Sequence, residues 1–517
     1  MTAVEWLIKG LQDRGVDWMA TLCGHGLDPL FHAAKRAGLR LLDTRNEQAA
    51  GYLADAYGKL TRRPGVCAVS SGLAHVNALS GVVNAFFDST PTLLISGAAA
   101  LRTAGMGHFQ DLDQVAMARP VTKFARFVDC PERILHILDE AWTAAVSYPP
   151  GPVHLTIPMD VQTAEVPSDA LLRPILPVPP LSATADLKAI VEALATSRRP
   201  LIVAGGGVFH AGVQDQLLAF SERFSVPVVV PIWDRGTVDR PASAVRGVIG
   251  AATGGPRLLP DADLILMAQA QPDYRVGYLQ PSALHPGAEV AFMDHRWSEL
   301  TEMYGGSPKT EWLSEATRRR DEFRAAVRQD GEQQAKRGTH AIHIVDALRE
   351  VLNDETALLI DGGSIGQWAH QLLCDRYPGH WLTCGRSAVV GWGLAGAMAA
   401  RIAYPARPVI VLSGDGAFTF TVAELECAVR QKLHFVAIVA DDQGWGITRA
   451  GHQKQFGEPI ASSLGPIDFA RLAESLGARG VTAHRSGEIL PHLRNALAKD
   501  GVTVIHVPVI GGSPTVG

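Results

Sequence analysis

Two aspartates, each directly after a predicted strand, have the type and spacing suited to binding a metal ion. Asp415 follows the apolar run 409–412 in a Ser-Gly-Asp-Gly turn, and Asp442 follows the next apolar run, 435–440. A helical pattern separates the runs, so we expect parallel strands whose carboxyl ends lie at one edge of a sheet. Two carboxylates, a turn carbonyl and phosphate oxygens form the oxygen shell that Mg²⁺ prefers. The pattern therefore predicts a site for Mg²⁺ and a phosphate-bearing ligand.

Glycines flank the first of these aspartates. Gly414 and Gly416 allow the backbone to approach a phosphate closely, and the N–H groups at the start of the following helix favour its negative charge. A lone Gly-Asp-Gly is usually only a turn. The second acidic turn, after the next strand, makes a binding site the better interpretation.

These turns resemble the diphosphate motif of thiamine diphosphate-dependent enzymes, in which Gly-Asp-Gly is followed after a fixed gap by Asn-Asn. The segment 381–394 resembles the strand and loop before that motif in acetolactate synthases, and 361–366 resembles the family's loop over the cofactor. Asp441-Asp442 stands in place of Asn-Asn, which adds negative charge beside the diphosphate. The resemblance implies that Asp415, Asp442 and the Gly444 carbonyl bind Mg²⁺. The implied cofactor contacts are Gly363, Ser364, Val390, Gly414, Asp415, Gly416, Ala417, Asp442, Gly444 and Trp445.

Glu47 begins an alanine-rich segment that resembles the family's glutamate segment. By itself it is an acid at a helix N-terminus, where the helix dipole favours it. The resemblance implies that Glu47 is catalytic: it would bond a ring nitrogen of the cofactor's aminopyrimidine and so promote removal of the thiazolium C2 proton. Such a proton transfer is typically worth ~10²–10⁴-fold. The cofactor would lie between two subunits, so Glu47 would act on thiamine diphosphate held by a partner chain.

Three further segments of the first block, 70–77, 87–91 and 108–115, also resemble family segments. Gln110 matches a glutamine that faces the reacting carbon and is our second catalytic candidate. The candidates for a substrate pocket are His25, His75, His108 and Trp445. For any single histidine a hydrogen-bonded structural role is the alternative, and Trp445 could equally wall the pocket or simply pack.

The segments 42–45 and 113–123 resemble benzaldehyde lyase, whereas other stretches resemble acetolactate synthase about as well. We therefore expect a lyase or carboligase that acts on a 2-oxo acid, aldehyde or 2-hydroxy ketone through a C2 carbanion/enamine. Two alternatives stay open. One is a catalytically silent binding or regulatory subunit, suggested by Asp441-Asp442 and by Val390, which is smaller than the family's usual Met or Ile. The other is an acyl-CoA-type lyase or decarboxylase.

Bulk properties exclude several classes of protein. The chain has 517 residues, 47% of them hydrophobic and 19% charged, as expected for an ordered globular protein. A net charge of −5 gives no reason to expect nucleic acid or anionic membrane as a partner. The six cysteines show no Cys-x-x-Cys pair, and no signal peptide or long apolar segment is visible. We expect a cytoplasmic enzyme with a small-molecule substrate.

Apolar runs alternate with helical patterns in three blocks, which predicts an α/β protein of three doubly wound parallel-sheet domains. The resemblance implies that this is the thiamine diphosphate-binding fold, with a pyrimidine-binding domain at 1–165, a central Rossmann-like domain at 185–335 and a diphosphate-binding domain at 340–517. A proline-rich linker, 166–184, follows the first block. The resemblance implies at least a homodimer, and we expect a homotetramer.

The central block has three consecutive glycines, 205–207, after a predicted strand. This spacing is not the Gly-x-Gly-x-x-Gly of dinucleotide sites, and no acidic residue sits after the next strand at the place where a ribose would need it. Some relatives hold a non-reacting FAD in this domain, but the segment 270–275 matches their flavin-contacting segment poorly. We therefore expect no FAD.

Overall fold

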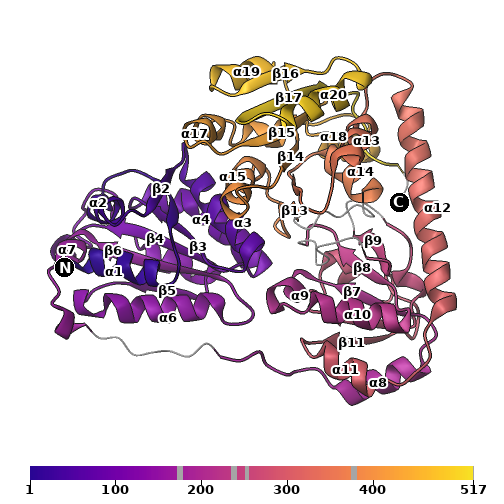
Figure 1. Cartoon of the computed structure of the whole chain (residues 1–517), viewed down its shortest axis with the longest axis horizontal. Coiled ribbons are helices and arrows are strands. Elements are labelled where there is room, and N and C mark those ends of the chain that lie inside the picture. Colours follow the sequence, from indigo (N-terminus) through magenta and orange to yellow (C-terminus); the bar gives the residue numbers. More distant parts are fainter. Residues whose placement is uncertain (172–178, 235–241, 251–254, 374–380, 516–517) are drawn as a thin grey trace. The chain divides into compact units, whose positions relative to one another are not determined.

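The computed structural model describes residues 1–171, 179–234, 242–250, 255–373 and 381–515 (Figure 1). The chain divides into two compact units. The first unit contains Met1–Pro180, Leu394–Pro405 and Thr421–Leu433, and the second contains Leu181–Gly393, Ala406–Phe420 and His434–Gly517. Within the described residues there are three parallel sheets flanked by helices, which confirms the predicted fold class.

The first sheet has six strands in the order β2-β1-β3-β4-β6-β5, all paired in parallel. The strands are β1 (Trp18–Leu22), β2 (Arg40–Asp43), β3 (Gly65–Val69), β4 (Thr92–Ala98), β5 (Phe124–Phe127) and β6 (Pro152–Pro158). The helices are α1 (Ala3–Asp13), α2 (Asp28–Arg36), α3 (Glu47–Thr61), α4 (Leu73–Asp88), α5 (Gln114–Ala118), α6 (Ile134–Val146) and α7 (Met159–Thr163).

Alternation along the strands decides what each face of this sheet packs against. Val66 and Ala68 of β3 join the apolar cluster that α1 and α6 cover. On the other side of the sheet, α3 and α4 pack against each other. Their backbones lie close together: a Cβ at Gly51 would be only 2.7 Å from the carbonyl oxygen of Ala78. The predicted small-residue helix that starts at Glu47 is therefore present as α3, and its small residues permit this close packing.

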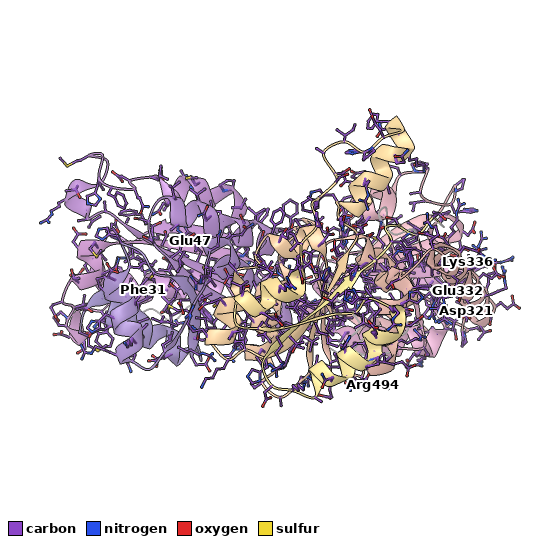
Figure 2. All side chains as sticks on the ribbon, turned by 90° about the horizontal axis from the view of Figure 1, so that it is seen from above. Phe31, Glu47, Asp321, Glu332, Lys336 and Arg494 are labelled. Atoms are coloured by element: carbon purple, nitrogen blue, oxygen red, sulfur yellow. The ribbon has the colours of Figure 1, made fainter. Side chains whose placement is uncertain are left out.

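The second sheet has the order β11-β10-β7-β8-β9, again parallel. Its strands are β7 (Pro200–Ala204), β8 (Val228–Pro231), β9 (Val245–Ile249), β10 (Leu264–Ala268) and β11 (Glu289–Met293). Its helices are α8 (Leu187–Thr196), α9 (Gly206–Ala211), α10 (Gln214–Phe224) and α11 (Trp297–Met303). The 26-residue α12 (Thr310–Ala335) follows α11 along the chain. Charged side chains such as Asp321 and Glu332 are exposed along it (Figure 2).

The third sheet has the order β13-β12-β14-β15-β17-β16. Its strands are β12 (Ala357–Ile360), β13 (Leu382–Thr383), β14 (Val409–Gly414), β15 (Phe435–Asp441), β16 (Arg479–Thr482) and β17 (Val502–Pro508). The helices in this part of the chain are α13 (Ala341–Val351), α14 (Ser364–Leu372), α15 (Gly393–Ala403), α16 (Asp415–Thr419), α17 (Glu424–Arg430), α18 (Gly446–Phe456), α19 (Phe469–Ser475) and α20 (Ser486–Leu497). The strand order repeats that of the first sheet, so the similar rhythm of the two blocks reflects a common topology.

Part of the expected proline-rich linker, 172–178, lies outside the described residues. The described cysteines, Cys23, Cys67, Cys130, Cys384 and Cys427, form no disulfide with one another. Among the residues that the structure describes, no helix has the length and apolar character needed to cross a bilayer.

Candidate functional site

The order in which the chain adds strands to the third sheet changes direction between β12 and β14. From β12 the chain adds β13 on one side, and it then returns to place β14 on the other side. The loops after β12 and β14 diverge at such a point, which is where open α/β sheets bind ligands. β14 and β15 are parallel neighbours with Gly414 opposite Ala440, so Asp415 and Asp442 follow the same edge of the sheet, as expected.

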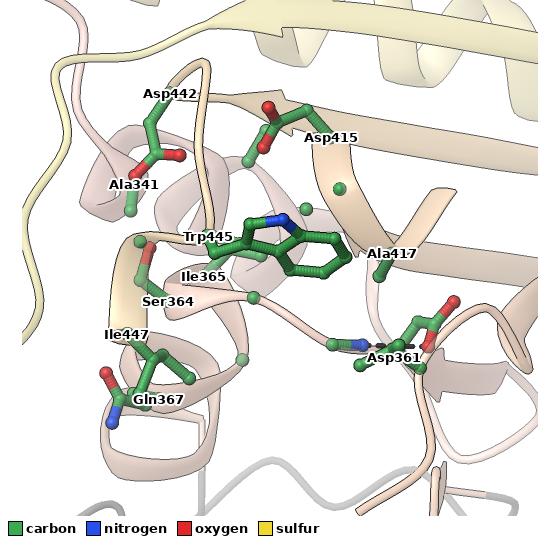
Figure 3. Close-up of a pocket in the computed structure, with 18 of the residues that line it drawn as sticks. Ala341, Asp361, Ser364, Ile365, Gln367, Asp415, Ala417, Asp442, Trp445 and Ile447 are labelled. Atoms are coloured by element: carbon green, nitrogen blue, oxygen red, sulfur yellow. Dashed lines mark hydrogen bonds between the residues drawn. The ribbon is translucent and has the colours of Figure 1, made fainter. Parts of the chain in front are cut away.

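A cavity of about 330 Å³ lies at this edge. It is lined by every residue of the second unit for which the sequence predicted a cofactor contact: Gly363, Ser364, Val390, Gly414, Asp415, Gly416, Ala417, Asp442, Gly444 and Trp445. The carboxyl groups of Asp415 and Asp442 lie on the same side of the Trp445 indole ring (Figure 3). The cavity therefore joins loops that follow β12, β14 and β15.

Asp415 is the first residue of α16 and is only 4% exposed. Its Oδ2 accepts a hydrogen bond of 3.0 Å from the backbone N–H of Gly444. Burial raises the pKa of Asp415 to about 6, and the neighbouring charges of Asp442 and Asp441 add to the shift. A buried carboxylate beside like charges is costly unless a cation compensates it.

Asp442 has a buried side chain, 6% exposed, whose Oδ2 lies 3.1 Å from Nη2 of Arg449. The ion pair has poor geometry for a hydrogen bond, and Oδ2 accepts none in the structure. Burial raises the pKa of Asp442, although the charge of Arg449 opposes the shift. Arg449 Nη2 also donates to the backbone carbonyl of Asp442, at 3.1 Å, so it holds the loop as well as facing its carboxylate.

The neighbouring Asp441 is held differently. Its Oδ2 lies 2.9 Å from Nε2 of the buried His506, and its Oδ1 accepts from the backbone N–H of Gln443 at 3.0 Å. Both oxygens of Asp441 therefore have protein partners, whereas Asp442 retains an oxygen without a hydrogen bond at the cavity.

This donor set fits a divalent cation bound together with a phosphate. Two carboxylates are available at the cavity, one with a raised pKa near neutrality and one with an unsatisfied buried oxygen. The described ranges contain no cluster of three or more His, Cys, Asp or Glu side chains suited to a metal. A cation here would take its remaining oxygen ligands from backbone carbonyls, water or a bound phosphate, which is the mixed shell typical of Mg²⁺.

Two glycines keep the loops close enough to form a cradle. Gly363 has φ of +117°, and a Cβ there would lie 2.9 Å from the Cα of Gly414. A Cβ at Gly416 would lie 2.9 Å from the Trp445 ring. That the backbone N–H groups at the start of α16 bind an anion stays a prediction.

Asp361 is a structural residue of the site that the sequence did not single out. It is buried and accepts hydrogen bonds from the N–H groups of Gly391 (3.1 Å) and Gly393 (3.0 Å). It thereby fixes the segment that carries Val390, whose Cγ1 would be only 2.7 Å from a Cβ at Gly362. The apolar side chain at Val390 is thus held against the cavity by the loop after β12.

Glu47 lies in the first unit, at the first residue of α3, after the capping residue Asn46 (Figure 2). It is partly exposed, and its Oε2 accepts a hydrogen bond of 3.1 Å from Nδ2 of Asn77. Because the cavity belongs to the other unit, the expected joint action of Glu47 with Asp415 stays a prediction.

The remaining candidates are also in the first unit, and they differ in exposure. Gln110 has φ of +56° and its Oε1 lies 3.3 Å from the Ser71 hydroxyl, beside the loop that follows β3. His25 and His108 are exposed. His75, by contrast, is completely buried, with its ring 4.6 Å from that of His154.

The place of His75 in a substrate pocket stays a prediction. Neither of its ring nitrogens has a hydrogen-bond partner among the described residues, and burial lowers its pKa to about 4. It is a neutral ring packed in the interior of the first unit.

The cavity also contains residues that the sequence did not suggest: Ile232, Trp233, Gln367, His370, Ile447 and Ile510. Trp233 has a φ of +65°, an uncommon conformation for a large side chain. No motif marks these positions, since they come from loops and helices that follow strands of two different sheets. Arg449 could have been found only by asking what balances the charge of Asp442.

Three models of the thiamine pyrophosphate enzyme family match the chain. The N-terminal TPP binding domain matches residues 1–117, the central domain matches 187–307, and the C-terminal TPP binding domain matches 361–507. The last match spans the cavity loops, and the first spans Glu47 and Gln110.

Curated relatives are similar over almost the whole chain. The acetolactate synthase large subunit IlvG of Mycobacterium tuberculosis is 28% identical, with 98% of this chain and 95% of the relative covered. The 2-hydroxyacyl-CoA lyase 2 of Bos taurus is 26% identical, with 97% and 89% covered. A third relative, from Pseudomonas aeruginosa, is named "Probable 2-ketoarginine decarboxylase AruI" and is 28% identical, with 98% and 94% covered. The names of these relatives refer to different substrates.

Proposed function

Because the chain belongs to the thiamine pyrophosphate enzyme family, we propose that it is a Mg²⁺-dependent lyase or carboligase acting on a 2-oxo acid, aldehyde or 2-hydroxy ketone. The observation that carries the proposal is the cavity at the β12/β14 edge, where two buried carboxylates face a glycine-rich helix start. Similarity to acetolactate synthase supports chemistry next to a carbonyl.

Different residues around the cavity would bind different parts of the cofactor. Asp415, Asp442 and the carbonyl of Gly444 would bind Mg²⁺, and the N–H groups at the start of α16 would bind the diphosphate. Val390 and Trp445 would provide apolar contacts that orient the rings. When bound, thiamine diphosphate supplies a nucleophilic carbon that adds to a carbonyl and accepts the electron pair left by a breaking C–C bond.

Glu47 would hold a proton against the aminopyrimidine ring of a cofactor bound by a partner chain. Its bond to Asn77 orients the carboxyl group at the start of α3. Gln110 would bind the reacting carbonyl from the same first unit. Proton transfer by a positioned carboxyl typically contributes ~10²–10⁴-fold to a rate. In this assembly each site needs two copies of the chain.

A second candidate is a lyase that cleaves 2-hydroxyacyl thioesters, which is favoured by the similarity to 2-hydroxyacyl-CoA lyase 2. Both candidates use the same cofactor and differ in the substrate bound. A panel containing pyruvate, benzoin and a 2-hydroxyacyl-CoA separates them by which compound is cleaved or consumed.

The proposal is tested by following exchange of the thiamine diphosphate C2 hydrogen with deuterium by NMR, with purified protein and Mg²⁺. We expect protein-dependent exchange, and a decrease of roughly 100-fold in Glu47→Gln, because its amide does not supply the carboxyl proton. Exchange at the same rate in both proteins would refute the proposed role of Glu47.

A further inference from the structure

A buried carboxyl group holds the backbone directly before Glu47. Glu424, the first residue of α17, is 1% exposed. Its two carboxyl oxygens lie 2.9 and 3.1 Å from the backbone nitrogen of Arg45, which donates to them. The N–H of Asn46 also faces this carboxyl group and lowers its pKa. One buried side chain therefore binds the amide of Arg45 and faces the amide of Asn46, directly before α3 and within the first unit.

Other contacts attach α17 to the same segment. Arg430 Nη1 and Gln431 Nε2 lie 2.7 and 2.6 Å from Oδ1 of Asp43. The thiol of Cys427 donates to the backbone carbonyl of Asp43 at 2.6 Å. Residues 43–46 are thus held at several points by α17 and Gln431, and among these contacts Glu424 is the one that binds the amide of Arg45, two residues before Glu47.

Burying the Glu424 carboxyl group costs free energy of folding, more than a merely structural contact would justify. Burial raises the pKa of Glu424 to about 7, and the nearby Arg45 directs its guanidinium to the more exposed Glu426 at 2.8 Å. Amide N–H groups before an exposed helix start are normally satisfied by water or by the capping side chain. A buried acid at this place therefore calls for a role beyond capping α3.

We propose that Glu424 is a positioning residue for Glu47, fixing the backbone of Arg45 and Asn46 so that the Glu47 carboxyl group is presented in one orientation. The inference rests on the proposed function, in which Glu47 acts on the cofactor. Along the chain α17 follows the Asp415 turn, so one crossover between β14 and β15 carries the cation-binding turn at its start and this clamp farther on. Glu424 itself touches neither substrate nor cofactor in this account.

The test uses the full-length chain with Glu424→Ala, Glu424→Gln and the control Glu426→Gln. Glu426 lies on the same helix but pairs with the guanidinium of Arg45 and not with its backbone, and its side chain is partly exposed. Amide hydrogen exchange is measured at residues 45–46 in the protein alone, and exchange of the thiamine diphosphate C2 hydrogen is measured with Mg²⁺. Calorimetry gives the affinity for thiamine diphosphate.

Glu424→Ala should increase amide exchange at 45–46 by at least about tenfold and slow C2 exchange by at least about tenfold, while the cofactor affinity changes less than about threefold. Glu424→Gln keeps one acceptor oxygen and should recover part of both effects, and it decides the matter if the alanine variant does not fold. Glu426→Gln should match the wild type.

Two results separate the failure of this inference from failure of the proposed function. If Glu424→Ala and Glu424→Gln keep wild-type C2 exchange while Glu47→Gln loses it, the positioning role is wrong and the proposed function stands. If Glu47→Gln also keeps wild-type exchange, the proposed function itself has failed.

Discussion

Asp442 brings a full negative charge to a position where related enzymes usually have an asparagine. In this chain the charge faces Arg449, which also donates to the backbone carbonyl of Asp442. The preceding Asp441 is satisfied by His506 and a backbone N–H. The two residues that depart from the family pattern therefore each have a partner suited to a carboxylate, as expected for buried charges.

This pairing predicts that restoring asparagine alone is harmful. In Asp442→Asn the net charge of the pair becomes positive, and an amide group faces the guanidinium where Oδ2 was 3.1 Å away. We expect Mn²⁺ to bind about tenfold more weakly, and the double variant Asp442→Asn/Arg449→Gln to recover most of the loss because the repelling cation is gone. Electron paramagnetic resonance titration of the full chain measures both. If the effects of the two substitutions on the free energy of Mn²⁺ binding simply add, the pairing of Asp442 with Arg449 is contradicted.

Glu424 also predicts a pH effect on stability. Its pKa is raised by burial from 4.5 to about 7, against the opposing influence of the bound backbone N–H groups and Arg45, with Glu426 also facing it. Between these values the folded chain binds more protons than the unfolded chain, so this group lowers the unfolding free energy as pH rises from about 4.5 to 7.

In Glu424→Gln the unfolding free energy should therefore fall less between about pH 4.5 and 7, by up to about 3 kcal/mol. Urea unfolding at several pH values measures it, with Glu426→Gln as the control. An unchanged slope in Glu424→Gln would show that the carboxyl group does not titrate in this range.

At the scale of elements, the glycine-rich turn between β14 and α16 is shaped by its neighbours. Gly416→Ala should abolish Mg²⁺-dependent thiamine diphosphate binding or weaken it by at least about tenfold, because the new Cβ would lie 2.9 Å from the Trp445 ring and push the two loops apart. Gly451→Ala is the matched control: Gly451 lies in α18, and a Cβ there meets nothing within 4 Å. Calorimetry on both variants checks the contrast, and equal binding would rule out the crowding argument.

The elements were largely predictable because buried parallel strands are continuous apolar runs that end in Gly, Ser or Asp. The runs 409–412 and 435–440 were predicted as strands and form most of β14 and β15. The turns of Asp415 and Asp442 were found for the same reason. Trp233 was not found, because no local pattern says which loops of two sheets meet. The burial of His75 was missed because its helix has an apolar face that admits a neutral ring.

In the whole molecule, each proposed cofactor site is made from two chains. Glu47→Gln and Asp415→Asn should each abolish C2 exchange alone. When the two variants are unfolded together and refolded, half of the dimers are hybrids with one intact site, so about a quarter of wild-type exchange should return. If Glu47 acts on the cofactor of its own chain, no exchange will return, and the shared site will be disproved.

The central claim is that two buried carboxylates at the β12/β14 edge hold a cation and, through it, a diphosphate. Isothermal titration of thiamine diphosphate into wild-type protein and Asp415→Asn, each with Mg²⁺ and with a chelator, tests it most directly. We expect the wild type to bind thiamine diphosphate only when Mg²⁺ is present, and Asp415→Asn to bind it at least about a hundredfold more weakly. Equal binding by the two proteins, or binding by the wild type that ignores Mg²⁺, would contradict it.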